Sequence, residues 1–155
     1  MEAVFESFVT TCMRHHYGES WHVEAQVNLH TLVRLNGKGL FKLRPDIHLR
    51  PRQNNQNRAM ICDVKWKMVE SGKATLDQSQ ADLYQMLAYG VNYQQGTGDM
   101  LLIYPSHEGF SQPLCHPYEF SHQKENPLRL WVVPFVIGNS LQSSGLLLPG
   151  EKNVI

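Results

Sequence analysis

Long hydrophobic runs and paired cysteines are both missing from this sequence of 155 residues. No apolar run approaches the about 18 residues of a membrane-spanning helix, so no membrane span is expected. The three cysteines, Cys12, Cys62 and Cys115, stand far apart without a C-x-x-C pair, which favours free thiols in a reducing compartment. The N-terminus lacks the basic region and apolar core of a secretory signal. We therefore expect a cytoplasmic protein.

The sequence also lacks an excess of either charge: its net charge is zero, because 14 lysines and arginines balance 14 aspartates and glutamates. A hydrophobic content of 42% is typical of a globular domain rather than a disordered chain. The eight histidines never recur at i, i+4, so no zinc site is expected. No G-x-x-x-x-G-K-[ST] loop occurs either, so the chain is not expected to use GTP itself. The length indicates one domain.

Hydrophobic periodicity predicts an α/β protein. The expected elements are a helix over residues 1–16, a strand within 21–35, a turn at 36–39, strands at 43–50 and 61–67, a helix at 78–94 and strands at 99–104 and 128–137. The strand at 99–104 is continuously apolar, which is typical of a central strand buried on both faces. Pro134 places the strand at 128–137 at an edge of the sheet. We expect one domain over residues 1–137 and a C-terminal tail over 138–155.

Polar side chains alternate with apolar ones in the strands at 43–50 and 61–67. Asp63 and Lys65 therefore lie on one face, roughly 6.6 Å apart along the strand. If the two strands pair as a hairpin across the polar residues 53–57, Asp46 joins them. Two carboxylates then converge with an ammonium group, and Mg²⁺ is held by carboxylates, waters and substrate phosphates. This predicts a metal-dependent phosphodiesterase site; the alternative is the solvated surface of an ordinary hairpin.

Positive charge is concentrated around these carboxylates. Eight lysines and arginines lie between Lys38 and Lys67 with only Asp46 and Asp63 among them, so this segment carries a charge of +6. Such local basicity suits a polyanionic substrate that must approach acidic metal ligands. The alternative for this segment is again a solvated hairpin.

Four further polar residues are candidates for supporting roles. Gln85 and Tyr89 are four residues apart, so they share one face of the helix that follows the Asp63 strand. Glu6 sits beside the apolar stripe of the first helix, where it is either a boundary residue or a third acid of the site. Glu24 is expected to be a solvent-facing strand residue.

Five blocks together resemble the nuclease domain of the McrC family, within the PD-(D/E)xK endonuclease superfamily. They are FESF (5–8), LRPDI (43–47), DVKWK (63–67), DLYQMLAY (82–89) and LIYP (102–105). The resemblance covers about residues 1–137. It implies a restriction-endonuclease-like fold, in which a central mixed β-sheet is flanked by α-helices. The chain has no counterpart of the region that precedes this domain in the family, which fits a fragment or a short relative.

The resemblance implies a Mg²⁺-dependent DNA endonuclease, with Mn²⁺ as a possible substitute, in a modification-dependent (5-methylcytosine) restriction system. Asp46, Asp63, Lys65 and Gln85 would be the catalytic residues, and Asp46 and Asp63 would bind the metal with Glu6 as a third acid. The partners would be double-stranded DNA and an McrB-like AAA+ GTPase. The alternative is a non-cleaving DNA-binding or structural subunit that kept the nuclease fold. The oligomeric state stays open.

Overall fold

The structure is a computed structural model that describes residues 1–53, 58–70, 80–121, 125–149 and 155. Two helices and nine strands lie in these ranges. They are α1 (Glu2–Tyr17), β1 (Trp21–Ala25), β2 (His30–Leu35), β3 (Lys38–Leu43), β4 (Ile47–Pro51), β5 (Met60–Val64), α3 (Gln80–Gln94), β6 (Gly98–Pro105), β7 (Tyr118–Glu119), β8 (Leu128–Val136) and β9 (Gly145–Leu146). Both predicted helices are confirmed, although the expected start of the second, at residues 78 and 79, lies outside the described residues.

Seven strands form one mixed sheet in the order β1-β4-β5-β6-β8-β7, with β9 also paired to β8. The strands β5, β6 and β8 are parallel, and β1, β4 and β5 pair antiparallel. The predicted hairpin across residues 53–57 is confirmed, because β4 pairs with β5 in the register Ile47↔Cys62. The prediction of a central strand is also confirmed, since β6 lies between β5 and β8 and its residues 100–105 are buried.

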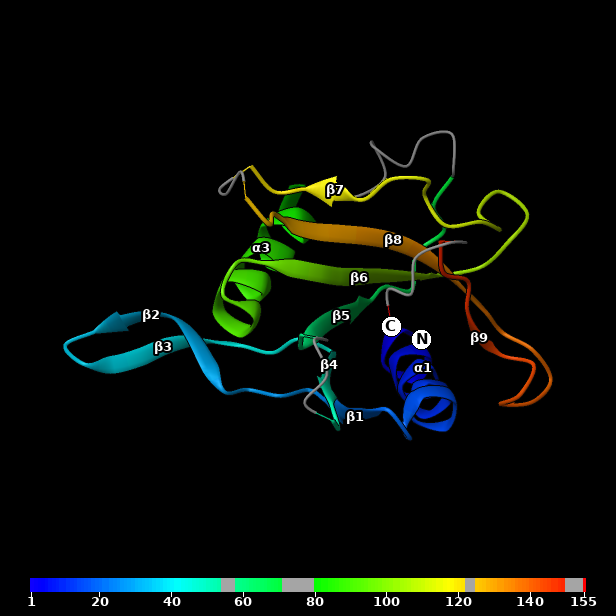
Figure 1. Ribbon diagram of the computed structural model, residues 1–155, viewed down its shortest axis with the longest axis horizontal. Coiled ribbons are helices and arrows are strands. Elements are labelled where there is room, and N and C mark those ends of the chain that lie inside the picture. Colours follow the sequence, from blue (N-terminus) through cyan, green and yellow to red (C-terminus); the bar gives the residue numbers. More distant parts are fainter. Residues whose placement is uncertain (54–57, 71–79, 122–124, 150–154) are drawn as a thin grey trace.

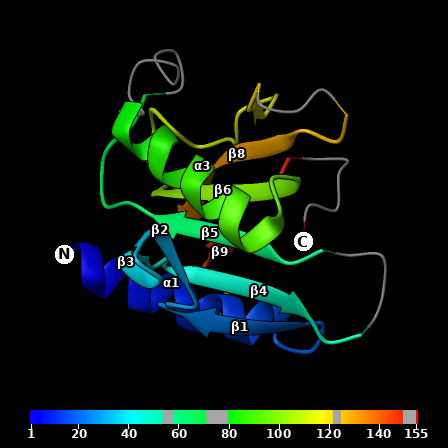
Figure 2. The same ribbon diagram turned by 90° about the vertical axis from the view of Figure 1, so that its left-hand side faces the viewer.

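One helix covers each face of the sheet (Figure 2). Side chains of β6 alternate between two apolar clusters, so that Leu101 and Ile103 pack with α1 while Met100 and Leu102 pack with α3. The period of two in the strand therefore divides the core into two layers. The protein is thus a mixed α/β fold. No helix in the described ranges is both long and apolar enough to cross a membrane.

The segment that carries Asp46 differs from the predicted strand over 43–50. The strand β3 ends at Leu43, β4 begins at Ile47, and Asp46 lies in the bend between them. Pro45 has no N–H to donate to a strand ladder and disfavours the helical conformation of Arg44, so the chain turns here. Asp46 consequently lies just before β4, at the end of the sheet, rather than within a strand.

The single strand predicted within residues 21–35 is two strands. Gln26 has a φ of 47°, which interrupts the extended chain after β1. The following strand β2 pairs only with β3, in a two-stranded sheet of its own. Asn36 and Gly37 join them with φ values of 48° and 79°, the left-handed pair typical of a two-residue hairpin turn. The predicted turn at 36–39 is therefore confirmed, and the hairpin extends away from the main sheet (Figure 1).

The expectation that Pro134 marks an edge strand is wrong. β7 and β9 pair with opposite ends of β8, and the backbone of Leu114 and Leu147 donates to Val132 and Pro134. Pro134 is tolerated because neither short strand includes it in its ladder. The expected tail also contributes to the fold: β9 joins the sheet, and His16 Nε2 donates to the carbonyl of Ser144 at 2.7 Å.

The contact between α3 and the sheet depends on Gly90. A β-carbon at Gly90 would lie 2.2 Å from Leu128 Cδ2 and 2.9 Å from Met100 Sδ. We expect Gly90→Ala to destabilise the protein by about 1–2 kcal/mol, because overpacking exceeds the gain in helix propensity. Thermal unfolding should detect a loss of about 2–4 °C per kcal/mol. The neighbouring Val91→Ala, at an exposed position, serves as the control and should change little. A Gly90→Ala protein as stable as the parent would contradict this close packing.

Candidate functional site

Asp46 and Asp63 come together because β4 pairs with β5. The bend before β4 brings Asp46 Oδ2 to 2.7 Å from the backbone N of Val64, which donates a hydrogen bond to it. Asp63 is the residue before Val64, and its side chain is only 2% exposed. The prediction that these two residues lie close together is therefore confirmed. Their proximity is produced by a side-chain-to-backbone bond at the point where the β4–β5 ladder ends.

Lys65 approaches both carboxylates from just beyond the end of β5. Its backbone N donates to the carbonyl of Ile103 at 2.9 Å, which continues the pairing with β6. Its Nζ lies 2.9 Å from Asp63 Oδ2 in an ion pair and donates to Gln85 Oε1 at 3.3 Å. The lysine side chain is 22% exposed. The ammonium is thus half-buried, fixed on two sides and still open to solvent.

A chain of hydrogen bonds from α3 sets the orientation of Gln85. The hydroxyl of Tyr89 donates to the carbonyl of Arg44 at 3.0 Å, so it accepts from Gln85 Nε2 at 2.8 Å. The amide of Gln85 must then present its oxygen to Lys65. Tyr89 therefore links the lysine to the backbone that precedes Asp46, and the face shared by Gln85 and Tyr89 is confirmed.

The surroundings of the site disfavour the charged form of both carboxyl groups. Burial, reinforced by the nearby charge of Asp63, raises the pKa of Asp46 from 3.8 to about 7. Burial also raises the pKa of Asp63, against the lowering effect of Lys65. Burial alone would lower the pKa of Lys65, but Asp63 and Asp46 raise it above its ordinary value. The lysine is therefore a stable positive charge, and the carboxylates gain from any further cation.

The donor set fits a hard divalent cation. Asp63 Oδ2 is buried, and its negative charge is met by the Lys65 ammonium at 2.9 Å. A buried carboxylate oxygen beside a second carboxylate is the kind of ligand that Mg²⁺ takes, with waters and phosphate oxygens completing its shell. Within the described part of the chain, no three His, Cys, Asp or Glu residues cluster closely enough to hold a metal ion.

Glu6 stands at the margin of this site. Gln26 Nε2 donates to Glu6 Oε1 at 2.9 Å, and the backbone N of Gln26 donates to the carbonyl of Asp46. The charge of Glu6 contributes, after larger effects, to the raised pKa of Asp46. Glu6 is thus held near the site by Gln26, and its role as a third metal ligand stays a prediction.

Sequence reasoning missed one acid of this neighbourhood, Asp82. Its charge contributes to the raised pKa values of both Asp63 and Lys65. Asp82 precedes Gln85 by three residues in α3, so the two share a helix face. Its spacing of three residues from the candidate Gln85 is the signal by which Asp82 could have been predicted from the sequence.

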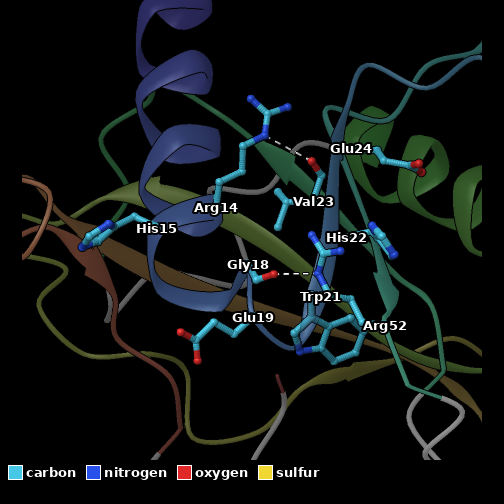
Figure 3. A pocket seen from close by; sticks show the side chains of 9 residues that line it. All are labelled: Arg14, His15, Gly18, Glu19, Trp21, His22, Val23, Glu24 and Arg52. Carbon is cyan, nitrogen blue, oxygen red and sulfur yellow. Dashed lines mark hydrogen bonds between the residues drawn. The ribbon is translucent and has the colours of Figure 1, made fainter.

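A separate pocket of about 410 Å³ lies between the end of α1 and β1 (Figure 3). Its two guanidinium groups are engaged with nearby backbone, since Arg14 donates to Val23 O and Arg52 to Gly18 O. Glu24 at its rim forms an ion pair with Arg50 and lies 3.6 Å from His48. None of the proposed catalytic residues lines this pocket. Glu24 is therefore a half-buried ion-pair partner rather than a solvent-facing acid.

Comparison with known proteins identifies the family. A profile of the family described as "McrBC 5-methylcytosine restriction system component" matches residues 1–105. The chain belongs to this family. A search of curated proteins found no match.

A solved structure shares the fold: the refined half-complex from a tetradecameric assembly of Thermococcus gammatolerans McrB AAA+ hexamers with bound McrC. The two chains are 14% identical with a TM-score of 0.61, over 88% of this McrBC-family chain and 28% of the matched one. The present chain therefore spans just over a quarter of the length of that chain. At this identity the likeness shows the fold alone.

The raised pKa of Asp46 predicts a pH-dependent stability. The carboxyl ionises near 3.8 when unfolded and at about 7 when folded, so the folded state binds more protons between these values. Stability then falls as pH rises through this window, by at most about 4 kcal/mol. Asp46→Asn cannot ionise and keeps an acceptor for Val64 N. We expect it to be more stable than the parent at pH 8, and to lose this advantage near pH 4.

Thermal unfolding at both pH values, without divalent metal, measures this difference. Glu24→Gln is the control of opposite sign, because the hydrogen bond from Arg50 lowers the pKa of Glu24. Glu24→Gln should therefore be less stable than the parent at pH 8 and equally stable at low pH. An Asp46→Asn variant with the same pH profile as the parent would mean that Asp46 titrates normally.

Proposed function

We propose that this chain is the nuclease part of a modification-dependent restriction system and hydrolyses DNA phosphodiester bonds with Mg²⁺. The observation that carries the proposal is the convergence of Asp46, Asp63 and Lys65 at the end of the β4–β5 pair. Family membership narrows the biological setting to 5-methylcytosine restriction. We take the mixed sheet between α1 and α3 as a PD-(D/E)xK fold, comprising residues 1–137 and the paired segment β9.

Asp46 and Asp63 would hold the metal. The chemistry that Mg²⁺ supplies when bound is to lower the pKa of a coordinated water and to offset charge on the attacked phosphate. Mn²⁺ is a plausible substitute, because it is bound by the same carboxylate and water ligands. The raised pKa values of both acids support this assignment, since a bound cation would offset the burial of both carboxylates and the effect of the Asp63 charge on Asp46.

Lys65 would act as a fixed positive charge. Its pKa is raised above the ordinary value, so the amine stays protonated and does not serve as a general base at neutral pH. An ammonium at this position can contact a non-bridging phosphate oxygen, where negative charge increases in the transition state. Gln85 would hold the ammonium in place, and Tyr89 would hold Gln85.

An AAA+ protein is the proposed partner. The structure that shares this fold contains McrB AAA+ hexamers with bound McrC. We infer that a corresponding hexamer presents DNA to this chain in the cytoplasm. Cleavage is therefore best measured both with the chain alone and with an AAA+ protein encoded beside it.

The decisive experiment compares the parent with Asp63→Asn in the presence of Mg²⁺ or Mn²⁺. Metal at tenfold its dissociation constant should stabilise the parent by about 1.4 kcal/mol, measured by thermal unfolding. Asp63→Asn should lose this effect, and cleavage of methylated plasmid DNA should fall by at least about a hundredfold. The exposed Glu19→Gln removes one carboxylate elsewhere and should retain both properties. Equal metal stabilisation and equal cleavage in parent and Asp63→Asn would remove the residue from the site.

A further inference from the structure

We propose that the β2–β3 hairpin is a DNA-contacting ribbon that enters a groove of the duplex beside the bond to be cut. The hairpin is a two-stranded sheet of its own and extends from the body of the protein (Figure 1). The inference rests on the proposed nuclease function only in taking DNA as the substrate.

The root of the hairpin is fastened to the candidate site by α3. The hydroxyl of Tyr93 donates to the carbonyl of Leu43 at 2.8 Å and accepts from the backbone N of Leu29 at 3.1 Å. The ring of His30 also packs edge-on against Tyr93, with centroids 4.5 Å apart. Both strands of the hairpin are therefore held at their base by one side chain. This fixes the direction of the ribbon relative to Asp46.

The charge of the hairpin complements a polyanion. No acidic residue occurs between Glu24 and Asp46. The same stretch carries four exposed cationic side chains, Arg34, Lys38, Lys42 and Arg44. Among the described residues, no hydrogen bond or ion pair of these four side chains is found. They are free to meet phosphate groups, which is the contact that dominates affinity for DNA.

Three other cations of the basic segment are placed differently. Arg50 pairs with Glu24, Arg52 donates to the carbonyl of Gly18, and Arg58 donates to Thr97 Oγ1. They lie at the opposite ends of β4 and β5 from Asp46, and each is already engaged within the protein. Within the +6 segment expected from the sequence, Lys38, Lys42 and Arg44 thus lie in or next to the hairpin, whereas these three arginines are engaged away from the site.

The dimensions and the apolar residues of the ribbon also fit. Two paired strands lie about 4.8 Å apart, so a ribbon with side chains suits the major groove, which is about 12 Å wide. The hairpin exposes large apolar side chains, with Leu35 63% and Phe41 73% exposed. In a groove these would contact sugars and the apolar edges of bases. The surrounding cations favour DNA over an uncharged protein surface as the occupant.

The test measures binding of a fluorescein-labelled duplex by anisotropy in EDTA over a series of salt concentrations, so that cleavage plays no part. Lys38→Ala/Lys42→Ala should weaken binding and reduce the slope of log K against log salt by about 1.8, for two lost phosphate contacts. Arg52→Ala/Arg58→Ala removes the same charge away from the site and should keep the parental slope. Equal slopes for all three proteins, or no binding by the parent, would overturn the proposal.

A second variant tests the apolar side chains. Leu35→Ala/Phe41→Ala changes only exposed positions, so the fold should be retained. We expect weaker DNA binding with an unchanged salt slope, because the lost contacts are not ionic. If this variant binds DNA as the parent does but sediments as a smaller species, the hairpin is an interface between copies and the proposal is wrong. Loss of cleavage with normal DNA binding in Asp63→Asn would leave the hairpin result unaffected.

Discussion

The hydrogen bond from Val64 N to Asp46 Oδ2 is the interaction on which the candidate site depends. It lies where the β4–β5 pairing ends. There the backbone N–H of Val64 has no partner in the ladder and donates to the carboxylate of Asp46 instead. The two acids are thereby brought together in a place from which water is largely excluded. Burial raises the pKa of both carboxyls, although the bond from Val64 by itself lowers that of Asp46, and Lys65 offsets the negative charge only in part.

Helix α3 organises the surroundings of that pair. Three of its side chains, each one turn after the last, reach the same side of the sheet. Gln85 contacts the lysine, Tyr89 binds the backbone before Asp46, and Tyr93 binds the base of the β2–β3 hairpin. Because residues four apart lie on one helix face, a single rigid element connects the charge centre to the surface proposed to meet DNA. Gly90 allows this helix to approach the sheet closely.

The sequence was sufficient for the features that depend on local pattern. Both helices, the central strand β6 and the β4–β5 hairpin follow from periodicity and turn residues. The convergence of Asp63, Lys65 and Gln85 follows from the period of two in the strand and of four in the helix. These contacts need only correct elements and a correct register, and both are encoded by nearby residues.

Features set by distant contacts could not be predicted in this way. The position of Asp46 in a bend depends on a bond to the next strand, and the independent hairpin depends on Tyr93, which lies far along the chain. β8 is covered by two-residue strands that leave almost no periodic signal. The segment after residue 137 is held by a bond from His16 to Ser144 across almost the whole sequence.

The most direct test of the central claim is a crystal structure of the protein grown or soaked with Mn²⁺, using the anomalous signal of the metal to locate it. We expect a peak between the carboxylates of Asp46 and Asp63, within about 2.5 Å of an oxygen of each, and no such peak in Asp63→Asn crystals treated identically. A fully occupied peak elsewhere, with Asp46 and Asp63 bound only to protein groups, would contradict the account.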